Sequence, residues 1–472
     1  MLHHLRIENF KAWKDTGDIE LAPISVFLGT NSSGKSSVFQ FLMMLKQTIQ
    51  DPDPATVLNT GDEKTIVDVG QPDHMLYHHS GVESLRFSYD WDVNQPFGYS
   101  LDGKAYHVAY NVNFNCSIEL TDFLALSLEV ACFSYKCSAS PRDLFSVIMR
   151  QSVEPETSAL SYAIELQELL WDSAPRFFQS SEKPFKFYGF SDDVTANTPN
   201  ITIFKGLNKI HPQLFSNMFY LGPLRDRASR LYAWKGNVPS DVGIDGSKAV
   251  FAMLSARSDF RKFELPNSET EYDIDVAVAQ MLKNMGLIER FRIGRIAQGR
   301  QEYEVQVKIK GSHVWADLPD VGCGVSQVLP VLVELFHAPP DSIILIEQPE
   351  LHLHPSAQAA LADVMIDAVL AKENGKPRNI QLLIETHSEH FLRRLQRRVA
   401  EETIPESMVR GYFCDTATDP FQLRKLEMDA YGNILNWPED FFGDMAGDIF
   451  GQAEAAFRRK KHEYERNDAE NH

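Results

Sequence analysis

Apolar runs alternate with helical patterns at both ends of the chain, and this alternation predicts a mostly parallel sheet. Near the N-terminus, predicted strands at 2–10 and 24–29 are followed by an amphipathic helix. Near the C-terminus, the apolar run 342–347 is followed by a predicted helix that begins at Pro355 and by a second apolar run at 379–386. Strands and helices in this order are typical of an α/β domain.

The middle of the chain follows two other patterns. From 85 to 135, apolar and polar residues alternate with a period of two, which predicts an antiparallel meander with a turn at Asp102 and Gly103. Between 140 and about 212, stretches such as DLFSVIMRQ and ALSYAIELQELLW predict an inserted helical subdomain. Further predicted elements are helices at 247–256, 274–287 and 325–336 and a hairpin at 304–319.

The composition narrows the class of protein. A chain of 472 residues with 43% hydrophobic and 24% charged residues is typical of a soluble globular protein, and no apolar run is long enough to span a bilayer. The N-terminus lacks the pattern of a signal peptide, and the five cysteines form no CxxC pair. We therefore expect that the protein is located in the reducing cytoplasm and that it has neither a disulfide framework nor a zinc knuckle.

The net charge of −19 opposes nonspecific attraction of the whole protein to nucleic acid. Any contact with DNA would need a local basic patch. The candidate patches are Arg290 to Arg300, Arg393 to Arg398 and Arg458 to Lys461. Each is more simply a solvated helix or hairpin face, since short charge runs are common on protein surfaces.

The stretch GTNSSGKSS lies between a predicted strand and a predicted helix and matches the pattern G-x-x-x-x-G-K-[ST]. In that context, backbone N–H groups and the helix N-terminus can cradle phosphates. Lys35 would neutralise the β- and γ-phosphates, Ser36 would bind magnesium, and Gly29 and Gly34 would allow close backbone approach. The expected nucleotide-binding residues here are Gly29, Thr30, Asn31, Ser32, Ser33, Gly34, Lys35, Ser36 and Ser37. A chance Gly/Ser-rich turn is disfavoured by the flanking elements.

The apolar strand of the C-terminal half ends in Glu347, as expected of the strand whose terminal acid holds magnesium. The next residue is Gln348, whose amide cannot accept a proton at neutral pH but can orient a water. Three interpretations remain open. Gln348 positions the attacking water and turnover is slow, Glu350 supplies the missing carboxylate, or ATP acts chiefly as a conformational switch. His352 and His354 lack a third metal ligand, so we expect loop or helix-cap histidines and no zinc.

The stretch DVGCGVSQ places small residues and Ser326 at the start of an apolar helix. Free N–H groups and a hydroxyl at a helix N-terminus can bind an anion. An ordinary capped core helix would have the same pattern.

Together these motifs resemble those of the ABC-type ATPases of the SMC/RecF/OLD group. The matching stretches are LRIENFKAW, GTNSSGKSS, GVSQ as a divergent signature motif, IEQPELHLHP as the acidic strand, and THS with its switch histidine. The chain looks closest to bacterial ATPases that carry YLGPLR in the middle and end in a short domain of unknown function, matched here by LEMDAYGNILNWPEDFF. The resemblance covers the two ends and part of the middle, and it does not cover about 135–217.

In that group, two ATPase heads sandwich two nucleotides. The resemblance implies that ATP and Mg²⁺ bind between two copies, that Gly324, Ser326 and Gln327 of one copy face the other copy's nucleotide, and that His387 senses the γ-phosphate. His387 has a plain alternative as the first residue of a helix. Gln71 corresponds to a candidate position in the family's Q-loop.

The fold class implied is an α/β P-loop ATPase head of the ABC type, with an antiparallel β-lobe and an inserted helical subdomain. The expected organisation is an N-terminal ATPase lobe with the P-loop and meander at 1–139, a helical insertion at 140–217, a C-terminal ATPase lobe at 218–405, and a short C-terminal domain with a charged tail at 406–472. No Toprim nuclease domain and no long heptads are visible, so any cleavage would belong to a partner.

Two groups of side chains outside the motifs also carry expectations. Arg225, Arg227 and Arg230 could contact phosphate or a partner, but salt bridges within an acidic protein are expected. The residues Trp437, Phe441 and Phe442 of NWPEDFF are expected to form core or a protein interface.

The expected function is ATP binding and slow hydrolysis, with ATP-dependent dimerisation or higher assembly that controls a separate effector such as a nuclease. The resemblance favours bacterial antiviral defence. One alternative is a non-hydrolysing ATP-gated scaffold whose closed state Gln348 keeps long-lived. Another is a RecF-like DNA-repair ATPase that contacts DNA through Arg290 to Arg300, and a transporter subunit is the least expected.

Overall fold

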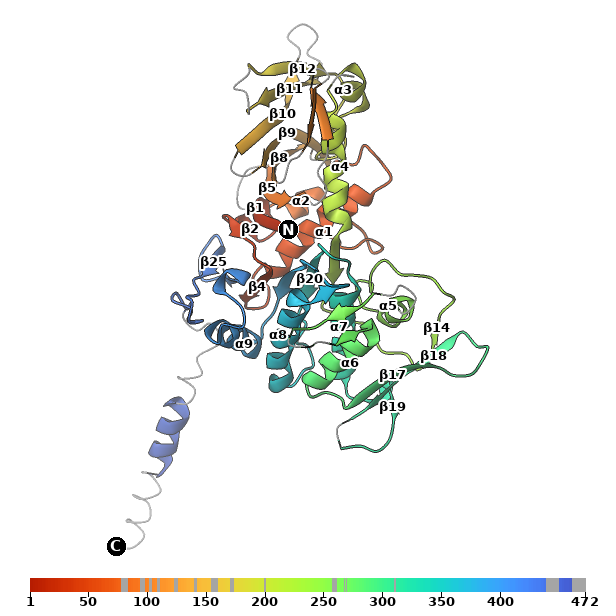
Figure 1. Ribbon diagram of the computed structural model, residues 1–472. Helices are drawn as coiled ribbons and strands as arrows, with labels where there is room; N and C mark the ends of the chain where they lie inside the picture. Colours follow the sequence, from red (N-terminus) through yellow and green to blue (C-terminus); the bar gives the residue numbers. More distant parts are fainter. Residues whose placement is uncertain are drawn as a thin grey trace, which may run out of the picture.

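The computed structural model shows an α/β body with an antiparallel β-lobe at one end and a small sheet at its side (Figure 1). The structure describes residues 1–77, 84–93, 98–101, 104–107, 111–122, 126–139, 142–153, 160–169, 174–198, 201–256, 261–266, 268, 270–309, 311–438 and 450–460. The predicted turn at Asp102 and Gly103 lies outside these residues, as do Phe441, Phe442 and Lys461.

The body is built on a six-stranded sheet in the order β13-β20-β23-β4-β24-β25. Its parallel strands are β13 (Met218–Leu221), β20 (Ile343–Glu347), β23 (Gln381–Glu385), β4 (Ile24–Gly29) and β24 (Val409–Asp415), and β25 (Gln422–Leu426) is antiparallel to β24. Strands β20 and β23 are buried at every position, as is typical of parallel strands covered on both faces. The prediction of a mostly parallel sheet is confirmed.

Successive side chains of the body's strands enter two different cores. Phe27 of β4 and Leu345 of β20 face a core that the body shares with the β-lobe, whereas Val26 and Ile346 face a second core. The helices are α1 (Lys35–Gln50) on the first side and α5 (Ala249–Ala256), α6 (Ile274–Asn284), α7 (Cys323–His337), α8 (Pro355–Leu370) and α9 (Glu389–Ala400) on the second. Packing on both faces fixes the loops that follow the strands.

The β-lobe is one antiparallel sheet in the order β12-β11-β10-β9-β8-β5-β1-β2, with a short strand β3 (Ile19–Glu20) paired to β1. Its strands are β1 (Leu2–Phe10), β2 (Trp13–Asp15), β5 (Ser84–Asp92), β8 (Asn111–Asp122), β9 (Ser127–Ala139), β10 (Arg142–Val153), β11 (Leu160–Glu168) and β12 (Arg176–Ser180). The predicted antiparallel meander is therefore confirmed, and it extends further along the chain than predicted.

The first half of the predicted helical insertion is wrong. DLFSVIMRQ belongs to β10 and LSYAIELQE to β11, and both pair with their neighbours in the lobe sheet. Because β9 pairs with β10, the sheet continues across the predicted boundary between 139 and 140. Only the second half is helical, in α3 (Asp192–Asn197) and α4 (Ile203–Ser216). Burial alternates along β11 with a period of two, although this stretch was predicted to be helical.

The segment after 405 completes the body, since β24 pairs with the P-loop strand β4.

The small sheet contains β14 (Tyr232–Ala233), β18 (Glu302–Lys308), β17 (Arg290–Arg295) and β19 (Ala316–Asp317), and the pairing of β18 with β19 confirms the predicted hairpin. The remaining elements are α2 (Pro72–Met75), β6 (Gly98–Leu101), β7 (Lys104–His107), β15 (Phe263–Glu264), β16 (Glu271–Tyr272), β21 (Lys372–Glu373), β22 (Lys376–Pro377), and 3-10 turns at Leu318–Asp320 and Glu406–Met408.

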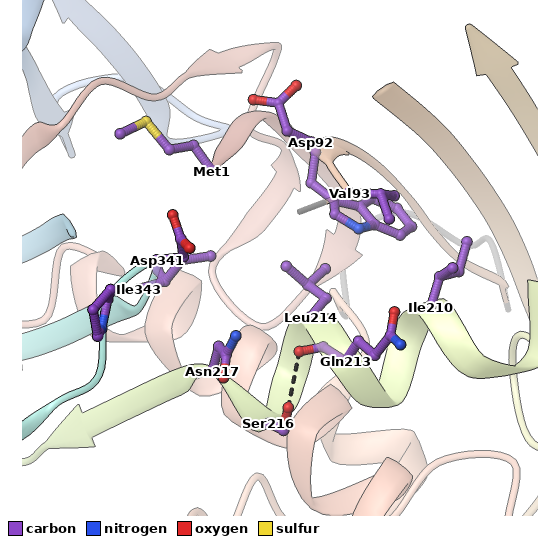
Figure 2. Close-up of a pocket in the computed structure, with 12 residues that line it drawn as sticks. Met1, Asp92, Val93, Ile210, Gln213, Leu214, Ser216, Asn217, Asp341 and Ile343 are labelled. Carbon is purple, nitrogen blue, oxygen red and sulfur yellow. Dashed lines mark hydrogen bonds between the residues drawn. The ribbon is translucent and has the colours of Figure 1, made fainter. Parts of the chain in front are cut away.

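The lobe and the body meet at a cavity of about 380 Å³ (Figure 2). Met1 and Asp92 reach it from the lobe, Gln213 from the end of α4, and Asp341 and Ile343 from the start of β20. Helix α4 runs from the lobe directly into the body's edge strand β13, so the two parts share a continuous element. Within the described residues, none of the helices is both long and apolar enough for a transmembrane span.

Candidate functional site

The phosphate loop lies where the sequence predicts it, between β4 and α1. Gly34 caps α1 with a φ of 88°, and a Cβ there would lie 2.9 Å from the Cβ of Ala12. A Cβ on Gly29 would lie 2.8 Å from the Ser33 hydroxyl. Both positions therefore require glycine for a tight loop, which leaves the N-terminus of α1 facing the cavity.

A cavity of about 380 Å³ opens over this loop. Its lining includes Gln348 from the turn after β20, Glu385 from the end of β23 and His387 just beyond it. The remaining lining residues are Lys11, Ala12, Asn31, Ser32, Ser33, Gly34, Lys35, Ser36, Ser37 and Gln40. The fold thus brings together loop residues and three residues that lie more than 300 positions away in the sequence.

Lys35 is buried at the base of the cavity. Its Nζ donates to the backbone oxygens of Gly29 at 3.1 Å and Thr30 at 2.6 Å, and it lies 4.0 Å from Oε1 of Glu385. Burial lowers the pKa of Lys35, and the negative charge of Glu385 opposes that shift. A cation held in this place is suited to binding phosphate oxygens.

Two buried carboxylates lie side by side at the carboxyl-terminal ends of two neighbouring strands of the body's sheet. Glu347 and Glu385 occupy partner positions at the ends of β20 and β23. Ser36 Oγ donates to Glu385 Oε2 at 2.7 Å, and the Tyr220 hydroxyl donates to Glu347 Oε1 at 2.7 Å. Burial, followed by the charge of Glu385, raises the pKa of Glu347 to about 7, and burial also raises the pKa of Glu385.

These residues fit a magnesium ion. Carboxylate and hydroxyl oxygens are the ligands that Mg²⁺ prefers, and the mutual repulsion of two buried acids would be relieved by a cation. In the described part of the chain, no cluster of three or more His, Cys, Asp or Glu could hold a metal alone. Mg²⁺ commonly binds one or two carboxylates together with substrate phosphates, so Ser36, Glu347 and Glu385 would suffice.

Glu385 and Tyr220 are site residues that were not predicted from the sequence. Glu385 directly precedes the Thr386-His387-Ser388 motif at a strand end, and this position was the available signal. Nothing in the local pattern indicates that Tyr220 reaches Glu347, because the two residues lie on different strands.

Gln348 has an unusual backbone conformation, with a φ of 44°. Its N–H donates to the Glu385 carbonyl oxygen at 2.7 Å, and its own carbonyl oxygen accepts from Arg225 Nη1 at 3.1 Å. Arg225 Nη2 also donates to the Glu347 carbonyl oxygen at 2.7 Å. Such a conformation persists only where its surroundings hold it, and here both sides of the residue are held.

Glu350 faces a different direction. Its Oε1 accepts from the His387 N–H at 2.7 Å, and burial raises its pKa. It does not line the cavity over the phosphate loop, within the part of the chain that the structure describes. A role for Glu350 in positioning the attacking water stays a prediction, and its observed contact positions the backbone of His387.

His387 lines the cavity, and its pKa is lowered by burial and by the charge of Lys35. Helix α9 begins at Glu389, and its N-cap is Ser388, which accepts from the N–H of Phe391. The alternative that His387 is simply the first helical residue is therefore wrong. Its role as a γ-phosphate sensor stays a prediction.

The signature segment lies elsewhere on the surface. Ser326 is half-buried in the first turn of α7 and lines a separate cavity of about 490 Å³ together with Gln327, Arg227 and His352. A Cβ on Gly324 would lie 3.1 Å from the His352 carbonyl oxygen, so this helix start packs closely against the turn after β20. Within one copy, Ser326 does not line the phosphate-loop cavity formed by the described residues.

Three further predictions have mixed outcomes. Gln71 is the N-cap residue of α2 and is not among the described residues that line the phosphate-loop cavity, so its contact with nucleotide stays a prediction. His354 caps α8 by accepting from the Ser356 N–H, which confirms the helix-cap interpretation. Trp437 packs against the second core and against Arg393 at 4.6 Å, as expected of a core residue.

The arginines of the YLGPLR region differ from one another. Arg230 pairs with Asp317 and Asp320, as predicted. The prediction is wrong for Arg225, which binds backbone carbonyl oxygens and whose burial lowers its pKa to about 10.

The arginines of helix α9, Arg393 to Arg398, pair with Glu389, Asp363 and Glu401, which supports the interpretation of that run as an ion-paired helix face.

Three family models match the chain. Residues 1–107 match a family described as "AAA ATPase domain", and residues 222–393 match one described as "AAA domain, putative AbiEii toxin, Type IV TA system". Residues 404–452 match a "Protein of unknown function (DUF3696)". Together with the phosphate loop, the two AAA matches indicate an ATPase domain. ATPases of this type bind ATP, generally with Mg²⁺.

Three solved structures of SMC heads resemble the chain remotely. The SMC head domain from Thermotoga maritima shares 7% identity over 90% of this chain and 99% of its own, with a TM-score of 0.39. An SMC head bound to the C-winged helix domain of ScpA shares 10% identity over 91% and 98%, with a TM-score of 0.40. The SMC head from Pyrococcus furiosus, bound to the C-terminal domain of ScpA, shares 10% over 90% and 96%, with a TM-score of 0.36. The likeness is remote, and nothing about function follows from it. No curated protein matches the chain.

Proposed function

We propose that this protein binds ATP with Mg²⁺, hydrolyses it slowly, and dimerises or assembles further when ATP is bound, and that this assembly controls a separate effector. The observation that supports the proposal is the separation of two surfaces on one copy. Lys35 and Ser36 line one cavity, whereas Ser326 lines another. A second copy can bring its Ser326 to the nucleotide that the first copy holds.

The surface around Ser326 has the features that a phosphate contact needs. Helix α7 presents N–H groups of its first turn and the half-buried Ser326 at the same end, and the Ser326 hydroxyl, which donates to the Cys323 carbonyl oxygen at 3.0 Å, can still accept a hydrogen bond. Arg227 lies on the same cavity wall and is exposed. These groups favour a triphosphate presented by another chain, because positive ends of helices and guanidinium groups both attract phosphate oxygens.

Slow turnover is supported by the chemistry at Gln348. The side chain lines the nucleotide cavity but cannot accept a proton at neutral pH, so it can orient a water without acting as a general base. We infer that hydrolysis limits the lifetime of the assembled state. Control of an effector in bacterial antiviral defence is favoured by the motif resemblance and by the match at 222–393 to a family whose description includes a toxin.

The test measures the molar mass of the purified chain with ATP and Mg²⁺, with ADP, and without nucleotide. We expect a larger species with ATP alone, lost in Lys35→Ala, which removes the phosphate-binding cation. Ser326→Arg should also prevent assembly, because it places a large side chain on the proposed contact, while ATP binding stays within about twofold.

The matched control is Ser407→Arg, which introduces the same bulk and charge at an exposed serine of the 3-10 turn at Glu406–Met408. This variant should assemble as the wild type does. Unchanged mass with ATP in the wild type, or normal assembly of Ser326→Arg, would rule out the proposed sandwich.

A non-hydrolysing scaffold is a second candidate, favoured by the amide at Gln348. Phosphate release distinguishes the two: turnover above the level of Lys35→Ala supports the enzyme, and ATP-dependent assembly without release supports the scaffold. Glu350→Gln adds a further distinction, since arrested turnover with normal ATP binding would give that carboxylate a part in hydrolysis.

A DNA-contacting ATPase is a third candidate, favoured by the arginines of β17. In the described part of the chain, Arg290, Arg292 and Arg295 form no ion pair, and Arg292 lies 4.5 Å from the Trp315 ring, whereas Arg300 pairs with Glu302. Direct DNA binding should weaken steeply with salt and should be lost when these three arginines are replaced by glutamine. Salt-insensitive or absent binding would exclude this candidate.

A further inference from the structure

The residue after Glu347 is an amide, but the neighbouring strand ends in a carboxylate at the same level of the sheet. Glu385 pairs with Glu347 in the parallel register of β23 and β20. Strand β23 lies between β20 and the P-loop strand β4. Glu385 is therefore one strand closer to the phosphate loop than Glu347 is.

The carboxylate of Glu385 contacts the phosphate loop. Its Oε2 accepts from the Ser36 hydroxyl at 2.7 Å, and its Oε1 lies 4.0 Å from the Lys35 ammonium. The Glu385 side chain is only 4% exposed, yet the residue lines the nucleotide cavity. Its carboxylate is therefore largely shielded from bulk solvent at the place where a nucleotide would bind.

Glu347 has different surroundings. Its Oε1 accepts from the Tyr220 hydroxyl at 2.7 Å, and its backbone oxygen accepts from Arg225. It does not belong to the lining of the cavity formed by the described residues. The Ser36 hydroxyl interacts with Glu347 as well and lowers the pKa of that carboxyl. Of the two acids, Glu385 is the one that lines the nucleotide cavity formed by the described residues.

We propose that Glu385 and Ser36 form the protein's side of the magnesium–nucleotide site, with Glu347 as a supporting acid behind them. The proposal rests on the nucleotide site of the proposed function and does not depend on assembly or on an effector. Paired carboxylate and hydroxyl oxygens suit a hard divalent cation, which Mg²⁺ sites complete with phosphate oxygens and water. Lys35 would then neutralise phosphate charge beside the cation.

The test uses Glu385→Gln in the full chain and measures ATP affinity by calorimetry with Mg²⁺ and with EDTA. The amide oxygen can still accept from Ser36, so the change removes the charge and preserves the shape. We expect Mg²⁺ to strengthen ATP binding by the wild type and this gain to fall roughly 10-fold or more in the variant. In EDTA the variant should bind ATP at least as tightly as the wild type, because a negative charge near the phosphates has been removed.

A second readout uses Mn²⁺ in place of Mg²⁺ and follows free Mn²⁺ by electron paramagnetic resonance in the presence of ATP. Glu385→Gln should leave more Mn²⁺ free than the wild type does at equal concentrations. Glu385→Asp retains the charge and should restore part of the metal affinity, which a purely structural role of Glu385 would not predict.

Glu334→Gln is the matched control, since Glu334 is also a buried glutamate of the body but lies on α7, outside the nucleotide cavity. It should leave the Mg²⁺ dependence unchanged. A Glu385→Gln variant with the wild-type gain from Mg²⁺ and wild-type Mn²⁺ binding would overturn the proposal. A wild type that binds Mg²⁺-ATP in this way but never assembles would refute the proposed function and leave the role of Glu385 intact.

Discussion

The β-lobe and the body both bury polar side chains, but the chemistry of the two regions differs. In the lobe, His211 lies between the hydroxyls of Tyr135 at 2.9 Å and Tyr89 at 2.8 Å, and burial lowers its pKa well below the usual value. The network is therefore neutral. In the body, Glu347 and Glu385 are buried beside each other, and burial raises the pKa of both.

A neutral network whose members satisfy one another costs little and orders the core around it. Neighbouring buried carboxylates are different, because desolvation and like-charge repulsion both oppose their ionisation. Perturbed acids in a cavity are a common sign of a functional site. This difference indicates that the polar residues of the lobe stabilise its core, whereas the acids at the carboxyl-terminal ends of the body's strands bind a ligand.

The largest expected effect comes from breaking the lobe's packing. Phe114 is fully buried, and its ring centroid lies 4.6 Å from that of His211 and 4.8 Å from that of Tyr135. Phe114→Ala should destabilise the protein by about 3–5 kcal/mol through lost burial and a residual cavity. Denaturant unfolding followed by tyrosine and tryptophan fluorescence measures the loss.

The exposed Phe177 of the same lobe, 71% accessible, provides the control. Phe177→Ala should change stability by less than about 0.5 kcal/mol. ATP affinity of the folded protein should be preserved in both variants. A loss of ATP binding by folded Phe114→Ala would contradict the division of roles between lobe and body.

The next effect concerns a buried acid outside the nucleotide cavity. Burial raises the pKa of Glu334 to about 7, and its Oε2 accepts from the Val242 N–H at 3.1 Å. Between the ordinary pKa near 4.5 and about 7, the folded state binds more protons than the unfolded state, so stability falls as pH rises through this window. Glu334→Gln should remove this dependence and be more stable than the wild type at pH 8 by about 3 kcal/mol.

Thermal unfolding of wild type and variant between pH 5 and 8 provides the measurement. The exposed Glu406→Gln serves as the control and should leave the pH profile of the wild type unchanged. Parallel profiles for wild type and Glu334→Gln would show that this acid is not a source of the body's pH dependence.

The smallest expected effect tests whether Arg225 holds the backbone of Gln348 in place without itself binding nucleotide. Arg225 spans two carbonyl oxygens with its guanidinium group, and a single ammonium cannot reproduce that geometry. Arg225→Lys should lower kcat roughly 5- to 30-fold, which corresponds to about 1–2 kcal/mol, with little change in KM. Steady-state phosphate release gives both parameters.

Arg230→Lys is the matched control, because Arg230 is exposed and pairs with Asp317 and Asp320 rather than with the turn after β20. Its kcat should equal that of the wild type. Equal kcat for Arg225→Lys would mean that Gln348 is held in place without Arg225.

The local pattern of the sequence determined the parallel sheet, the phosphate loop and the helix that follows it. Strand β4, the glycines and Lys35 lie within a short stretch, so their chemistry and their structure can be read together. The same holds for the apolar strand that ends in Glu347 and for the cap at His354.

Only the tertiary structure decided the rest. Strands β10 and β11 were predicted as helices because short runs with many apolar residues fit both periods, and pairing with their neighbours settled the outcome. Ser36 and Glu385 are 349 residues apart, and their contact depends on the position of β23 beside β4. Local periodicity reports which side of an element is buried, whereas contacts between distant segments depend on strand order and register, which no local pattern encodes.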